Sequence, residues 1–124
     1  MSKVSVEKKA LVKVFGSATA YYPAFSKVLG DACAGIFVSR LFYWMDKTQD
    51  PDGWIYKTAE DMEDETGLTR SNQFTARKKA RELGVVEEKL KGVPATMHYR
   101  VNLDRLLQLV ADDARHNWRD QDQA

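Results

Sequence analysis

The stretch Gly67–Val86, GLTRSNQFTARKKARELGVV, places five basic side chains between two glycines. Thr69 is a favoured N-cap residue, and Gly84 suits the position just after a helix. This spacing predicts a helix from Thr69 to Leu83. At 100° per residue, four side chains share one side of it and should face the core: Gln73, Ala76, Ala80 and Leu83.

The opposite side of this expected helix is basic, with short polar groups near its start and one aromatic ring. Cations suit phosphates, short polar side chains suit base edges, and the positive end of the helix dipole favours anions. The pattern therefore predicts a helix that reads duplex DNA. The residues on this side are Arg70, Ser71, Phe74, Arg77, Lys78 and Arg81.

Opposite charges are separated along the chain. Residues 46–65 contain eight acids and two lysines, a net charge of −6, whereas residues 70–91 contain seven bases and three acids, a net charge of +4. The whole chain carries only +1. A nearly neutral chain with separated signs is expected to have two unlike faces.

Cap and turn signals divide the rest of the chain into elements. Asp31 is the expected N-cap of a buried helix that starts at Ala32. Thr58 is the expected N-cap of an acidic helix that ends at Gly67. Two short helices about three residues apart, followed by a hairpin, predict an α+β, mainly α, winged helix-turn-helix fold. The other expected elements are a strand or extended arm over residues 8–15, a helix over 17–30 capped by Ser17 or Thr19, a strand over 54–57, hairpin strands over 85–91 and 96–102, and a helix over 103–117.

The length of 124 residues predicts one domain. We expect an N-terminal arm or strand over residues 1–16, a winged-helix domain with flanking helices over 17–117, and a flexible tail over 118–124. Cys33 is the only cysteine, which favours a buried thiol in a reducing compartment. The longest apolar stretch is 14 residues and includes Arg40, so we expect no membrane span and a cytoplasmic protein.

Three segments carry a family resemblance: WIYKTAEDMEDETGLT at 54–69, RELGVVEE at 81–88 and GVPATMHYRVNLDRL at 92–106. They resemble the winged-helix proteins of phages, prophages and plasmids, which include replisome organisers, replication initiators and helix-turn-helix regulators. AGIFVSRLFYW at 34–44 is similar to the helix that leads into that domain. The resemblance covers roughly residues 20–107.

The resemblance implies a recognition helix within residues 69–83 and a β-wing within residues 85–101. The acidic second helix and the short chain beyond the domain both depart from the family pattern. These departures are compatible with a regulator, or with a protein that keeps the scaffold and binds another partner. The residues that the resemblance and the basic face assign to DNA are Thr69, Arg70, Ser71, Asn72, Phe74, Thr75, Arg77, Lys78, Arg81, Lys89, Lys91, His98 and Arg100.

No residue pattern predicts catalysis. His98 and His116 lie far apart, without a cysteine or carboxylate at ligand spacing, so we expect no metal site. Cys33 has no partner base in its apolar run, and no glycine-rich phosphate loop occurs. We therefore expect a protein that is not an enzyme and takes no cofactor.

Two functional hypotheses remain open. The first is a DNA-binding homodimer in phage or plasmid replication or in transcription regulation, paired through its N-terminal arm or its last helix. The second is a phage-encoded module that inhibits or adapts a host nucleic-acid machine, such as a CRISPR or replication complex. Its protein-binding face would be acidic and would consist of Glu60, Asp61, Glu63 and Asp64.

Overall fold

Six helices and a small sheet make up the part of the chain that the computed structural model describes, residues 7–122. The sheet is antiparallel with strand order β1-β3-β2. The architecture is thus α+β and mainly helical. The elements are α1 (Lys8–Phe15), α2 (Pro23–Leu29), α3 (Ala32–Trp44), β1 (Ile55–Tyr56), α4 (Ala59–Thr66), α5 (Arg70–Glu82), β2 (Val86–Lys91), β3 (Thr96–Val101) and α6 (Leu103–Asp122).

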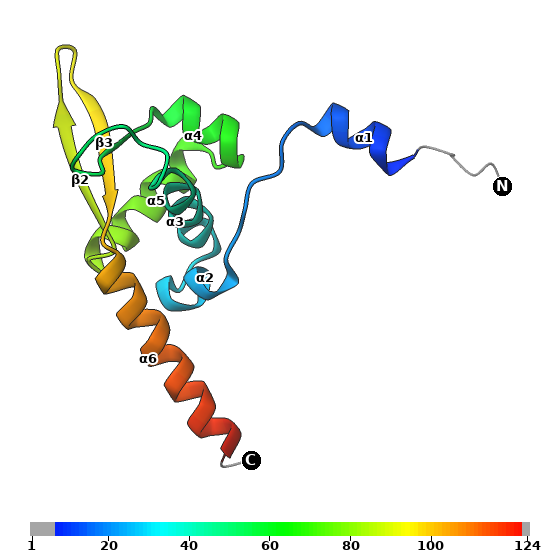
Figure 1. Cartoon of the computed structure of the whole chain (residues 1–124), viewed down its shortest axis with the longest axis vertical. Helices are drawn as coiled ribbons and strands as arrows, with labels where there is room; N and C mark the ends of the chain where they lie inside the picture. Colours follow the sequence, from blue (N-terminus) through cyan, green and yellow to red (C-terminus); the bar gives the residue numbers. More distant parts are fainter. Residues whose placement is uncertain (1–6, 123–124) are drawn as a thin grey trace.

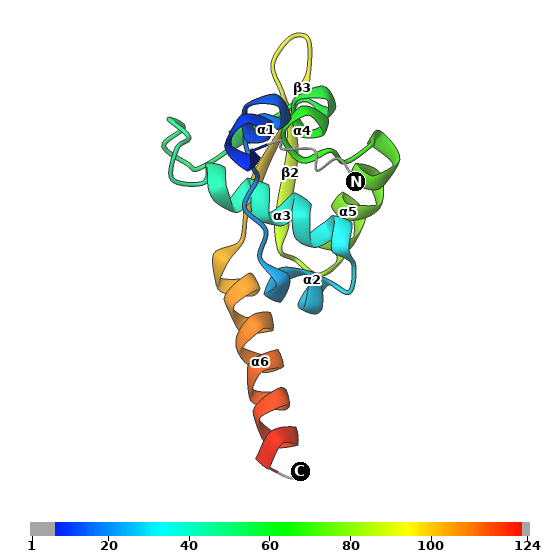
Figure 2. The ribbon, with the colours of Figure 1, turned by 90° about the vertical axis from the view of Figure 1, so that its right-hand side faces the viewer.

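Helix α3 runs through the centre of the fold, as the sequence predicts (Figure 2). The Asp31 side chain accepts a hydrogen bond from the Ala34 N–H at 2.9 Å and caps the helix. Phe37 and Leu41 are fully buried. Gly35 allows α2 to approach, because a Cβ there would lie 2.8 Å from the Ser26 Cα.

Helices α4 and α5 are joined by only three residues, 67–69, and each starts with a reciprocal cap. The Thr58 hydroxyl accepts from the Asp61 N–H while the Asp61 carboxylate accepts from the Thr58 N–H. Thr69 and Asn72 form the same arrangement at the start of α5. These caps confirm the predicted start of both helices.

The buried side chain of Gln73 ties α4 to α5. Its Nε2 donates to the carbonyls of Ala59 and Leu68, at 2.9 and 3.0 Å. Ala76 and Ala80 are fully buried on the same side of α5. The predicted core-facing side is therefore confirmed, and the buried amide is satisfied.

The β2–β3 hairpin has one face toward the core and one toward solvent, because successive side chains alternate. Glu88 pairs with Tyr99, and the Tyr99 ring packs on Phe37 of α3, which defines the inner face. Lys89 pairs with His98 on the outer face. The hairpin and α6 project from the body in opposite directions, and α1 lies apart from it (Figure 1).

Three predictions about chain boundaries are wrong. Residues 8–15 form helix α1 rather than a strand. Leu11, Val14 and Phe15 have the i, i+3, i+4 spacing of one helix face, but the alternating lysines and valines also fit a strand. Helix α2 begins at Pro23, whose fixed φ suits the first helical turn. Helix α6 continues to Asp122, because no glycine or proline interrupts it, so the tail predicted over 118–124 is helical as far as 122. Residues 123–124 lie outside the described residues.

No helix within residues 7–122 is long and apolar enough to cross a membrane. Cys33 is half-buried and packs against the core, less enclosed than the sequence predicts.

Candidate nucleic-acid interface

The first turns of α5 present an open polar surface. Arg70, Ser71, Phe74, Thr75 and Lys78 are all exposed. Neither Arg70 nor Lys78 has an ion-pair partner among the described residues. This surface keeps the cations and the exposed ring that the sequence predicts, beside the positive end of the helix.

Thr69 and Asn72 are partly committed to the helix cap. The Asn72 Oδ1 accepts from both the N–H and the hydroxyl of Thr69, at 3.2 and 2.8 Å. These two residues therefore shape the start of α5, and they lie at the same end of the helix as Arg70.

In the second half of α5, a carboxylate from the hairpin pairs with two of the arginines. Glu88 on β2 accepts from the Arg77 Nε at 2.6 Å and from the Arg81 Nη1 at 2.7 Å. Burial opposes ionisation of Glu88, but the hydrogen bonds from Arg77 and Arg81 outweigh it and lower its pKa. The bond to Glu88 likewise raises the pKa of Arg77 against the effect of burial. Two of the predicted phosphate ligands are thus engaged within the fold.

The predicted wing residues lie on the outer face of the hairpin, away from α5. Arg100 donates to Glu87 at 2.7 Å, and its guanidinium lies 4.4 Å from the Trp54 ring centroid. The Lys89 ammonium lies 4.1 Å from the same ring. The alternation of the strands therefore divides the predicted site into an α5 surface and an outer-face surface. Lys91 and His98 belong to the outer face.

Three residues of the acidic helix α4 are exposed: Glu60, Glu63 and Asp64. Asp61 is different, since its carboxylate completes the cap, and the hydrogen bonds from Thr58 lower its pKa. The exposed acids form a surface separate from the cap.

A second carboxylate cluster was not predicted from the sequence. Glu65, at the end of α4, accepts from Arg40 Nε at 2.6 Å, Lys57 Nζ at 2.5 Å and the Trp44 indole at 2.7 Å. The Thr19 hydroxyl donates to the Glu65 backbone carbonyl. The cluster thus joins α3, the residue that follows β1, α4 and the segment before α2. A lone acid at the end of an acidic run gives no sign of such partners.

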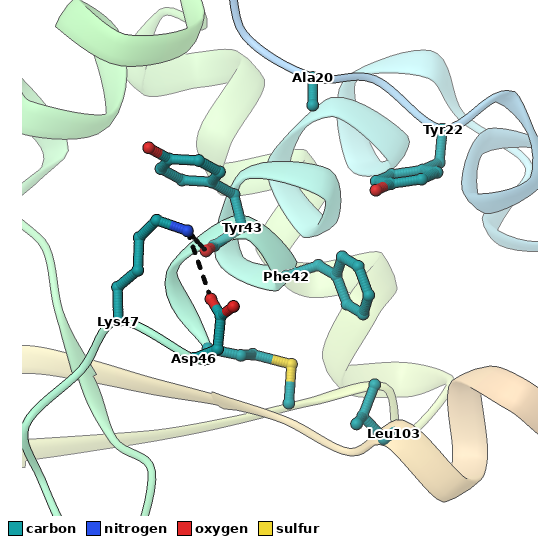
Figure 3. Close-up of a pocket in the computed structure, with 8 residues that line it drawn as sticks. Ala20, Tyr22, Phe42, Tyr43, Asp46, Lys47 and Leu103 are labelled. Atoms are coloured by element: carbon teal, nitrogen blue, oxygen red, sulfur yellow. Dashed lines mark hydrogen bonds and ion pairs between the residues drawn. The ribbon is translucent and has the colours of Figure 1, made fainter.

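An apolar cavity of about 440 Å³ lies between the segment before α2, the end of α3 and the start of α6 (Figure 3). Tyr22, Phe42 and Leu103 line both this cavity and an adjoining groove along α6. Tyr22, Phe25 and Phe42 pack ring on ring, with centroids 4.9 to 5.8 Å apart. These rings therefore serve packing, and they leave an apolar opening beside α6.

Comparison of the chain with protein-family models, with curated protein sequences and with solved structures gave no match.

Proposed function

We propose that the protein binds double-stranded DNA through α5, as a winged helix-turn-helix module with the β2–β3 hairpin as its wing. The observation that carries this proposal is the open surface at the start of α5, where Arg70 and Lys78 flank Ser71, Phe74 and Thr75. Two cations can contact phosphates on either side of a groove while short polar groups and a ring meet base edges. The three-residue joint between α4 and α5 supports the proposal.

The biological setting that we propose is replication initiation or transcription regulation in a phage or plasmid, as the sequence resemblance implies. Contacts between the exposed cations and phosphates should supply most of the affinity, so the affinity should depend strongly on the salt concentration.

The test is fluorescence anisotropy with a labelled random duplex at about 50 and about 200 mM salt. We expect binding that weakens steeply as salt rises. An absence of binding at the lower salt concentration would refute the proposal.

We also propose that the working form is a homodimer. Helix α1 buries none of its residues, and an isolated eight-residue helix is marginal in water, so its apolar side needs a partner. The apolar groove beside α6 offers one in a second copy, because Leu107 is exposed there and Asp46 lines the adjoining cavity, where a lysine of α1 could meet it. A reciprocal exchange of α1 would bury both surfaces twice.

Sedimentation equilibrium tests the dimer. Phe15→Asp in α1 and Leu107→Asp in α6 should each give monomers, because each places a charge in the apolar contact. Val93→Asp, at an apolar position of the hairpin tip that is even more exposed, should remain dimeric. A wild-type monomer, or a dimer that both α1 and α6 variants leave intact, would contradict this assignment.

A second candidate function is a protein-binding module that meets a basic host protein through α4. The neutralised arginines at Glu88 and Glu87, together with the exposed Glu60, Glu63 and Asp64, favour it. Charge reversal of these three α4 residues should abolish a host complex. Asp61 is left unchanged, because its reversal would break the helix cap.

A further inference from the structure

The outer face of the sheet carries two rings and a cation in one row. Tyr56 on β1 is directly opposite His98 on β3, and His98 is directly opposite Lys89 on β2. The centroids of the Tyr56 and His98 rings are 5.5 Å apart. Directly opposed side chains stand close together, so the three form a continuous strip across the strands.

The aromatic part of this strip is open to solvent. Tyr56 is 49% exposed and points away from the core that its neighbour Ile55 enters. A solvent-facing strand position needs no ring for stability. The exposed Tyr56 ring is a planar group on which another planar group can stack, and the half-buried His98 ring lies beside it, tilted by 45° to it.

Two lysines supply positive charge on this face, Lys89 within the strip and Lys91 beside it. Trp54 holds Lys89 against its ring, at 4.1 Å from the centroid. Lys91 is exposed on the same face, one step closer to the hairpin tip. Of the carboxylates near this face, Glu87 is paired with Arg100, whereas Asp50 accepts from the neutral Trp54 N–H and keeps its charge, which acts on both Lys89 and Lys91.

We infer that this outer face binds single-stranded nucleic acid, with bases stacked on Tyr56 and His98 and phosphates at Lys89 and Lys91. Rings bordered by cations are the combination that holds unpaired bases, whereas the bases of a duplex are stacked on one another and present only their edges. The inference goes beyond the proposed duplex-binding function. The two surfaces lie on opposite sides of the sheet, so one molecule can hold a duplex on α5 and an unpaired strand on the outer face.

The test is anisotropy of the full chain with a labelled oligothymidine of about 15 nucleotides, and in parallel with oligouridine, which distinguishes DNA from RNA as the favoured strand. Tyr56→Ala should weaken binding about tenfold or more, since stacking is removed. Tyr56→Phe should bind like the wild type, because the ring remains. The control is Tyr21→Ala, which removes a tyrosine that is 46% exposed elsewhere and should leave binding unchanged.

Two further measurements distinguish a loss of single-strand binding from misfolding of a variant and from a change in duplex binding. In the wild type, NMR amide shifts caused by oligothymidine should centre on Tyr56, Lys89 and His98. The variants Arg70→Ala and Lys78→Ala should weaken duplex binding only. The inference is overturned if the wild type does not bind either single strand, if Tyr56→Ala binds as tightly as the wild type, or if the amide shifts centre on α5. Loss of duplex binding alone would refute the proposed function and leave this inference standing.

Discussion

Two carboxylates, Glu65 and Glu88, are 18% and 10% exposed and each hold a pair of cations, but the cations of the two clusters differ in exposure. At Glu65, the side chains of Arg40 and Lys57 are only 14% and 12% exposed. At Glu88, those of Arg77 and Arg81 are 26% and 43% exposed. A mostly enclosed cation is held by its partner, whereas a more exposed one can exchange that partner for a phosphate. We therefore regard Glu65 as a structural lock and Glu88 as an exchangeable partner within the proposed interface.

The largest expected effect is on stability, from Glu65→Gln. Two enclosed cations would lose their counter-charge, so the free energy of unfolding should fall by about 2 kcal/mol, less than for a fully buried pair because the cluster still reaches solvent. Urea unfolding measures the change. Glu63→Gln, an exposed acid on the same helix, should change it by less than about 0.5 kcal/mol. Equal effects would mean that the Glu65 cluster does not lock the fold.

The second-largest effect is expected at low pH, where the Glu65 cluster should contribute less to the stability of the fold. Burial opposes ionisation of Glu65, but hydrogen bonds from Lys57, Arg40 and Trp44 outweigh it, so its folded-state pKa lies below the ordinary value of 4.5. Its stabilising contribution is complete above the unfolded-state pKa and disappears as the pH falls through the folded-state value. Urea unfolding from about pH 6 to about pH 3 should show this decrease.

The matched comparison for acid is again Glu65→Gln, which should flatten the pH dependence, whereas Glu63→Gln should keep it. The pKa of Glu88 is lowered too, so part of the acid sensitivity should persist in Glu65→Gln. A Glu65→Gln profile as steep as that of the wild type would contradict the assignment.

A smaller change in stability, about 1 kcal/mol, is expected for Glu88→Gln, because Arg81 can turn to solvent. Although Glu88→Gln should lower stability, it should raise the affinity for duplex DNA. Release of Arg77 and Arg81 should tighten duplex binding and steepen its salt dependence by up to about two phosphate contacts. Glu87→Gln is the control, since it releases Arg100 on the outer face, away from α5, and should tighten duplex binding much less than Glu88→Gln does. If both variants tighten binding equally, net charge rather than position decides the affinity.

The sequence predicts most of the local structure, because caps, glycines and turn residues act over a few positions. The boundaries of α4, α5 and the hairpin follow from Thr58, Thr69 and Gly84 in this way. The division of the predicted site into two surfaces could also have been predicted, because adjacent residues of a strand, such as Glu88 and Lys89, face opposite sides of the sheet. The partners of Glu65 and Glu88 could not be predicted, because they join elements whose distance depends on the packing of α3, α4 and the sheet. The helical state of α1 was missed because a short run of alternating lysine and valine fits either period.

The most direct test of the central claim is the salt dependence of duplex affinity in Arg70→Ala/Lys78→Ala compared with the wild type. Both residues are exposed and without ion-pair partners within the described chain, so the fold should be unaffected. We predict weaker binding and a log–log salt slope shallower by about two units, one for each phosphate that the variant no longer neutralises. An unchanged affinity and slope would show that α5 does not contact DNA.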